Sequence, residues 1–139
     1  MSKLLYSLGI TLLLSTFVFA QNAKKVEVEV ILKTTKSWTG AVLPSYPKGQ
    51  PEITILKVII PPKTKLPVHE HPVINAGILT KGVLTVITKD KKVLQMKAGD
   101  SISEVVKTWH HGENQGDEPA EIIVFYAGIK GAPITIKEK

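Results

Sequence analysis

All four histidines of this 139-residue chain fall in two short segments. His69 and His71 are one residue apart, and His110 and His111 follow about forty residues later. Alternate side chains of a β-strand share a face, so His69 and His71 are expected to point the same way. Paired neutral imidazoles suit a divalent transition metal, and a third ligand must then come from another strand. Only one of His110 and His111 can face the pair. The alternative is that all four are ordinary core or surface histidines, but their grouping favours a metal site.

The elements that must position these histidines are short β-branched runs separated by turn residues. After residue 20, no stretch of ten or more residues carries helical apolar spacing free of Gly or Pro. The pattern predicts an all-β sandwich or barrel, and an antiparallel barrel or jelly roll would hide the strand edges. The predicted strands are Val26–Leu32, Ile53–Ile60, Val68–Ile74, Ile78–Thr80, Val83–Thr88, Val93–Lys97, Ser101–Val106, Ile122–Tyr126 and Pro133–Ile136.

Two segments before the predicted strand Ile53–Ile60 allow more than one interpretation. Val26–Val30 alternates Val and Glu, which predicts a strand with one buried face and an edge that a second copy could cover. Gly40–Pro51 contains three prolines, two glycines and Tyr46, and is either a surface crossover or a lid over an opening.

Composition excludes several classes of protein. The chain has no cysteine, which rules out disulfides, thiolate zinc sites, iron–sulfur clusters and a cysteine nucleophile. The net charge is +6, but all 18 basic residues are Lys and they are scattered. Without Arg, the chain lacks the bidentate fork typical of phosphate and guanine recognition. We therefore expect a solvated surface and no nucleic-acid partner.

The first twenty residues have the pattern of a secretory signal peptide. Lys3 is followed by an apolar run from Leu4 to Phe19, and Val18 and Ala20 suit the −3 and −1 positions of a cleavage site. An uncleaved anchor is the alternative, since the run is near the lower limit for a spanning helix. We expect cleavage after Ala20, a single domain over residues 21–139, a secreted or periplasmic location, and membrane contact only through the signal segment.

The histidine segments resemble the two motifs of the cupin family. The first motif, G-x5-H-x-H-x3/4-E-x6-G, is matched by His69, His71 and Gly82, with Lys63 at the leading glycine and Asn75 at the glutamate. The resemblance spans about residues 50–126. It implies a cupin-type double-stranded β-helix, or jelly-roll, barrel.

The second motif, G-x5-P-x-G-x2-H-x3-N, is matched by Gly99, His110 and Asn114, with Val105 and Lys107 replacing the proline and the inner glycine. The register assigns the third ligand to His110 rather than His111. The resemblance also implies a structural role for Asn114, closing the turn after the ligand strand.

Asn75 is the important departure, because the family has a metal-binding glutamate there. An amide is a weak, neutral ligand through its oxygen alone. Either a three-histidine site with open positions remains, with Asn75 beside the metal, or Asn75 is a structural hydrogen-bonding residue and the metal is weakly held. Glu104 and Glu113 could supply a carboxylate, although neither lies at a family ligand position. Trp109 is expected to pack on the opposite face from His110.

Two functions follow from this site. The first is a divalent transition metal, from Fe, Mn, Co, Ni, Cu or Zn, held by His69, His71 and His110 for oxygenation or isomerisation of a small molecule. The second is non-catalytic capture of a metal or small ligand in the cell envelope. Because small cupins commonly pair through sheet edges, a homodimer is also expected.

Overall fold

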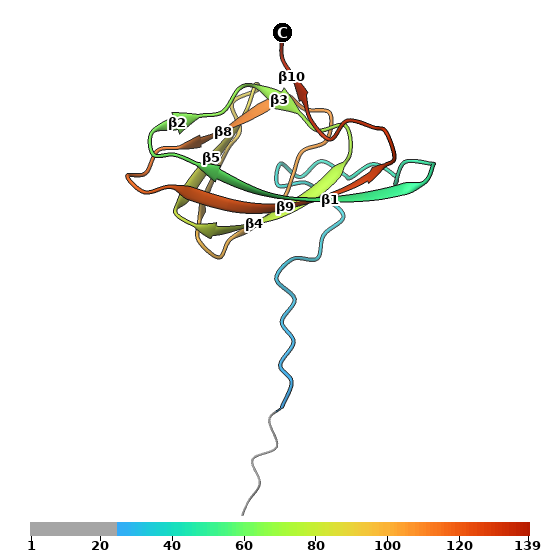
Figure 1. The fold of residues 1–139 in the computed structure, drawn as a ribbon, viewed down its shortest axis with the longest axis horizontal. Coiled ribbons are helices and arrows are strands. Elements are labelled where there is room, and N and C mark those ends of the chain that lie inside the picture. Colours follow the sequence, from blue (N-terminus) through green and yellow to red (C-terminus); the bar gives the residue numbers. More distant parts are fainter. Residues whose placement is uncertain (1–24) are drawn as a thin grey trace, which may run out of the picture.

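The computed structural model describes residues 25–139, and the signal-peptide prediction for residues 1–20 lies outside that range. The described chain forms two antiparallel sheets that enclose a barrel (Figure 1). It contains strands and turns but no helix, so the all-β jelly-roll prediction is confirmed over residues 25–139. Accordingly, no helix within this range has the length and apolar character needed to cross a membrane.

The strands are distributed between the sheets by non-local pairing. In the first sheet, the order is β1 (Pro51–Ile60), β9 (Ala120–Ile129), β4 (Ile74–Lys81) and β7 (Ser101–Ser103). In the second, it is β10 (Ile136–Lys137), β3 (His69–Glu70), β8 (His110–Asn114), β5 (Val83–Thr88) and β6 (Val93–Lys97), with β2 (Thr64–Lys65) also paired to β8. Successive strands therefore cross from one wall of the barrel to the other, except that β2–β3 and β5–β6 each stay within the second sheet.

Strand alternation builds the core between these walls. In β9, Ile122, Val124 and Tyr126 point inward, and the intervening side chains are more exposed. In β5, Leu84 and Val86 face them from the other sheet and belong to the same apolar cluster. Burying these faces supplies most of the driving force for closing the barrel.

The N-terminal arm, residues 26–32, differs from the prediction. It forms no strand within the described chain, and Val26 and Val28 are more than 80% exposed. Figure 1 shows this arm (blue) running away from the barrel. Its apolar alternation therefore has no partner strand in residues 25–139, which is why the predicted buried face does not form.

The tight turns explain the glycine positions of the two motifs. Gly82 has a φ of 75°, and a Cβ there would lie 2.8 Å from the Pro119 carbonyl oxygen. Lys63 and Lys107, which replace motif glycines, keep left-handed φ values of 55° and 52°. The backbone path of the motifs is thus retained at both lysines, at a steric cost that glycine would avoid.

Candidate metal centre

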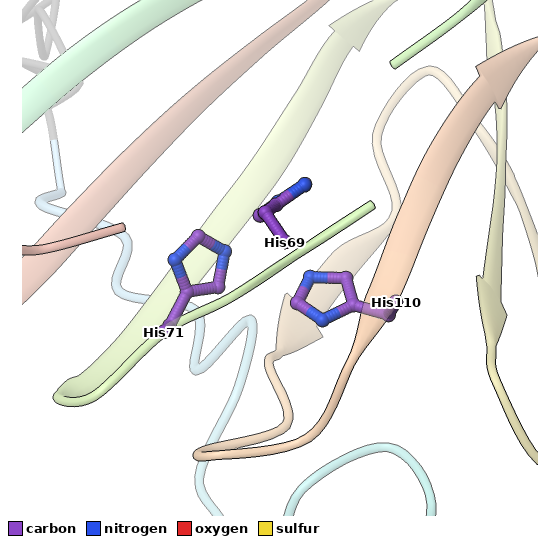
Figure 2. Close-up of side chains that lie close together, drawn as sticks. All are labelled: His69, His71 and His110. Atoms are coloured by element: carbon purple, nitrogen blue, oxygen red, sulfur yellow. The ribbon is translucent and has the colours of Figure 1, made fainter. Parts of the chain in front are cut away.

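The structure brings His69, His71 and His110 together inside one end of the barrel (Figure 2). His69 in β3 is paired directly across from His110 in β8, and their ring centroids are 4.5 Å apart. His71 lies just after β3, with its ring 5.0 Å from His69 and 5.1 Å from His110. One ring nitrogen of each residue lies within 4.8 Å of the others. The three side chains therefore converge on a volume the size of a metal ion.

Backbone carbonyls fix the proton on each imidazole. The Nδ1 atoms of His69, His71 and His110 lie 2.8, 2.9 and 2.8 Å from the carbonyl oxygens of Pro67, Ile134 and Thr108. A carbonyl only accepts, so each Nδ1 must donate, and Nε2 of the neutral ring keeps its lone pair. This is the tautomer and orientation that a metal ligand needs.

Burial also keeps the rings neutral. It lowers the pKa of His71 to about 4, with hydrogen bonding to Ile134 opposing the change and the other histidines adding to it. Burial likewise lowers the pKa of His69 and of His110. At pH 7 the cluster therefore presents neutral imidazoles, with lone pairs available for a cation.

Asn75 in β4 lines the same cavity. Its side chain is 1% exposed, and neither the amide nitrogen nor the amide oxygen has a hydrogen-bond partner within the described residues. Most buried polar atoms are paired, so an orphaned amide beside three imidazoles indicates that a polar group or ion belongs there. The donor set and this orphaned amide fit a divalent transition metal.

Glu104, directly after β7, is the carboxylate that enters the cavity. Its Oε2 atom is 3.8 Å from His110 Nε2, and the side chain is 12% exposed. Burial raises the pKa of Glu104 to about 7, although the backbone N–H of Val105 and the nearby His69 lower it. The Trp38 indole lowers it further but makes no well-formed hydrogen bond. Motif matching alone gives this residue no role.

The other candidates lie outside the cavity. Glu113 and His111 face outward from β8 and bond to each other over 2.9 Å, and Lys65 lies 3.4 Å from Glu113. Trp109 stacks under the Lys89 ammonium, 5.7 Å from the ring centroid, as strand alternation predicts. Tyr46 is 74% exposed and does not line the histidine cavity.

The histidine cavity has a volume of about 200 Å³ and continues into the apolar core. Tyr126 contributes a buried ring 5.3 Å from His71, and Thr135 lies near the His71 Nδ1 atom. A larger space of about 380 Å³ lies outside the barrel, between residues 37–47 and the turns at 72–74 and 105–108. Among the described residues, its lining includes no histidine or carboxylate, so the smaller cavity is the candidate site.

A family model for the cupin domain matches residues 56–126, which is about half of the chain and includes all three clustered histidines. The chain is a cupin. The resemblance inferred from the two motifs is therefore confirmed for the fold and the family.

Solved structures give the same fold. This cupin is 21% identical to oxalate decarboxylase from Lactobacillus farciminis, with a TM-score of 0.54 over 61% of this chain and 26% of that one. A double-stranded β-helix protein from Klebsiella pneumoniae is 20% identical, with a TM-score of 0.54 over 80% of this chain and 100% of that one. A cupin-like protein from Thermotoga maritima is 15% identical, with a TM-score of 0.53 over 62% and 64%.

The cupin spans 26% to 45% of the length of three enzyme structures it resembles, which are an oxalate decarboxylase, a DMSP lyase and an oxalate oxidase. A search of curated proteins by sequence finds no significant match. These likenesses establish the architecture, and the chemistry has to be argued from the site itself.

Proposed function

We propose that this cupin binds a divalent transition metal through His69, His71 and His110 and uses it to oxygenate or isomerise a small molecule. The observation that carries the proposal is the shared geometry of the three imidazoles. One nitrogen of each lies within 4.8 Å of the others, and each Nδ1 donates to a carbonyl. Three oriented neutral imidazoles leave coordination positions for substrate or water.

The bound metal would act as a Lewis acid and, if it is redox-active, would also support O2 chemistry. The chain contributes the rest. The three histidines hold the ion at one end of the cavity, and apolar residues from both sheets exclude bulk water. Asn75 offers an unpaired amide for orienting a polar substrate group. A volume of about 200 Å³ corresponds to roughly six or seven waters, so the substrate must be small.

The proposal is tested by elemental analysis of the purified protein without a His tag. His69→Ala, His71→Ala and His110→Ala are compared with His111→Ala, whose side chain faces outward. We expect near-stoichiometric metal in the wild type and the control, and loss of metal in the other three. Mn is among the candidate metals, and Mn(II) centres are named for the oxalate decarboxylase of Bacillus subtilis. A wild type that binds no metal even after reconstitution would overturn the proposal.

Non-catalytic ligand capture is the second candidate, and the small, largely apolar cavity supports it. The two functions are separated by adding a catechol- or diketone-like compound to the metal-loaded protein. A spectral change at the metal followed by O2 uptake or product isomer favours the enzyme. Tight binding with no turnover favours the binding protein.

We also propose that the protein is exported. The charged start, apolar run and small-residue cleavage site in residues 1–20 support this. Mass spectrometry of protein recovered from the periplasm or medium tests it. A mass that begins at Gln21 is expected, and a protein that stays in the cytoplasm with residues 1–20 attached would contradict it.

A homodimer is proposed from the open edge of the first sheet. β1 pairs with β9 on one side only within the described chain, and its outward residues Ile53, Ile55 and Ile59 are each about 60% exposed. A long, apolar edge strand is a template for pairing with another copy. Light scattering should give the dimer mass, and Ile55→Lys should shift it toward the monomer. A monomeric wild type would contradict the proposal.

A further inference from the structure

We propose that Glu104 is a fourth metal ligand, supplying from the neighbouring strand the carboxylate that position 75 lacks. The inference rests on the proposed metal centre and specifies its ligand set. It assigns a role to a residue at an unspecified position of the second motif, between Gly99 and Val105.

The strand register places Glu104 next to Asn75. β4 and β7 pair Ala76 with Ser103 and Gly77 with Ile102, so the next opposite pair is Asn75 and Glu104. The backbone N–H of Glu104 donates to the Asn75 carbonyl oxygen over 3.1 Å, which continues the ladder. Residues directly opposite in an antiparallel pair share a face. A carboxylate at 104 therefore enters the barrel from the same side as one at 75, displaced by a single strand.

The distance to the histidines fits shared coordination. Glu104 Oε2 lies 3.8 Å from His110 Nε2. Two ligands that each lie about 2.1 Å from one ion are about 3 to 4 Å apart, depending on whether they are cis or trans. The carboxylate oxygen is thus within the range of a ligand pair with His110. Glu104 is not among the residues whose ligand atoms all lie within 4.8 Å of one another, so its side chain must rotate to join the other two histidines.

The buried charge needs a cation. Among the described residues, the recorded ion-pair partner of Glu104 is His110, and no lysine is recorded within salt-bridge distance of its carboxylate. The Val105 N–H supplies one hydrogen bond at 3.1 Å. A carboxylate buried without a counter-ion is costly, and such groups are generally paired or coordinate metals. A metal held by the three histidines would provide the missing positive charge.

Asn75 is compatible with this arrangement. Two carboxylates directly opposite each other would repel, so a glutamate at 75 and a glutamate at 104 are not expected together. An amide at 75 removes that repulsion, and its unpaired nitrogen can donate toward the carboxylate. The two positions therefore act as alternative sources of one negative charge.

The test uses Mn²⁺ titration of the full chain, followed by EPR, together with the visible spectrum of the Co²⁺-loaded protein. Glu104→Gln is compared with the double variant Glu104→Gln/Asn75→Glu and with Glu113→Gln, an outward-facing control. We expect Glu104→Gln to bind Mn²⁺ about 10- to 100-fold more weakly, the loss typical when a group supporting a metal site is removed, and to shift the Co²⁺ bands. The double variant should regain most of the affinity, and the control should match the wild type.

Glu104→Gln affinity within twofold of the wild type would overturn the proposal, as would a double variant that gains nothing over the single one. If Glu104→Gln does not fold, Glu104→Asp replaces it, because the shorter side chain withdraws the oxygen and should cause a similar loss. The His71→Ala variant distinguishes a failure of the proposed metal centre from a failure of the role proposed for Glu104. Wild-type binding by His71→Ala contradicts the metal centre itself, whereas an effect confined to the histidine variants contradicts only the role of Glu104.

Discussion

Two asparagines in this barrel are equally buried and have opposite surroundings. Asn114 in β8 and Asn75 in β4 are each 1% exposed. The two N–H bonds of the Asn114 amide are shared among the carbonyls of Ile60, Pro61 and Glu118, and its oxygen accepts from the Gly116 N–H. The Asn75 side-chain amide has no hydrogen-bond partner in the part of the chain that the structure describes. Burial alone therefore does not reveal the role of a polar residue, whereas its unpaired atoms do.

The difference separates scaffold from site. Asn114 links the end of β8 to the turn after β1, so its hydrogen bonds hold the loops in place. Asn75 contributes nothing comparable to the metal-free fold, and its burial without partners costs stability. A cost of this kind is expected where a ligand will later supply the missing contacts.

The largest expected effect comes from substituting Asn114, the asparagine that holds the loops in place. Asn114→Ala should lower the free energy of unfolding by about 3 kcal/mol or more, because several carbonyls lose a donor inside the barrel. Asn75→Ala should change it by less than about 1 kcal/mol, since the lost packing is offset by removing two unpaired polar atoms. Urea unfolding of the metal-free proteins measures both values. Equal losses would show that Asn75 is structural after all.

Stabilisation of the protein by metal should depend on the histidine site around Asn75 and not on Asn114. A ligand that binds the folded state alone stabilises it by about 2.7 kcal/mol at a concentration 100 times its Kd. We expect this gain in the wild type and in any Asn114 variant that still folds, and no gain in His71→Ala. Thermal unfolding with Mn²⁺ and after chelation measures it. A gain that survives in His71→Ala would place the metal elsewhere.

The pH dependence of stability in the metal-free protein should test the histidine site further. His71 has a folded pKa of about 4 against 6.5 in the unfolded chain, so the unfolded state binds the extra proton and stability falls as pH falls through this range. Glu104 has a folded pKa of about 7 against 4.5, and its folded state binds the proton, so it acts in the opposite direction. Between pH 7 and 5, each group changes the free energy of unfolding by about 2 kcal/mol, His71 lowering it and Glu104 raising it.

The other groups facing this pair are His69, His110 and Tyr126. Burial lowers the pKa of His69 and of His110, and these two therefore add to the loss at low pH. Burial raises the pKa of Tyr126, which stays protonated throughout. Glu104→Gln should consequently lose stability more steeply than the wild type from pH 7 to 5, and His71→Gln less steeply. Parallel curves for all three proteins would contradict this account.

Much of the barrel was predictable where local pattern and turn agreed. Val83–Thr88 and Val93–Lys97 match β5 and β6 in full, because alternating β-branched residues flank a tight turn. Val68–Ile74 is wrong as one strand, since Pro72 and Val73 form a bend between β3 and β4. β8 was not predicted, because His110–Asn114 has weak strand propensity and is held by pairing with β5, β3 and β2.

The clustering of the three histidines was predictable from motif spacing and strand parity, whereas Glu104 was only one of two candidate carboxylates. The three clustered histidines were the predicted ones, and Asn75 points inward as its parity with His69 indicates. The choice of Glu104 over Glu113 comes only from the register of β4 against β7, which depends on long-range pairing. The sequence signal for Glu104 is an acidic residue directly after a short run of Ser and Ile.

The smallest expected effect concerns the two lysines at glycine positions of the scaffold. Lys107 has a φ of 52°, and its N–H donates to the His71 carbonyl over 2.8 Å, so its turn helps to set the position of that ligand. Lys107→Gly relieves left-handed strain but gives the unfolded chain more freedom, and we expect a net change below about 1 kcal/mol. Because the turn is retained, Mn²⁺ affinity should stay within twofold of the wild type. A clear rise in affinity would mean that backbone strain at the turn holds His71 away from its preferred position, and that scaffold and site are not independent.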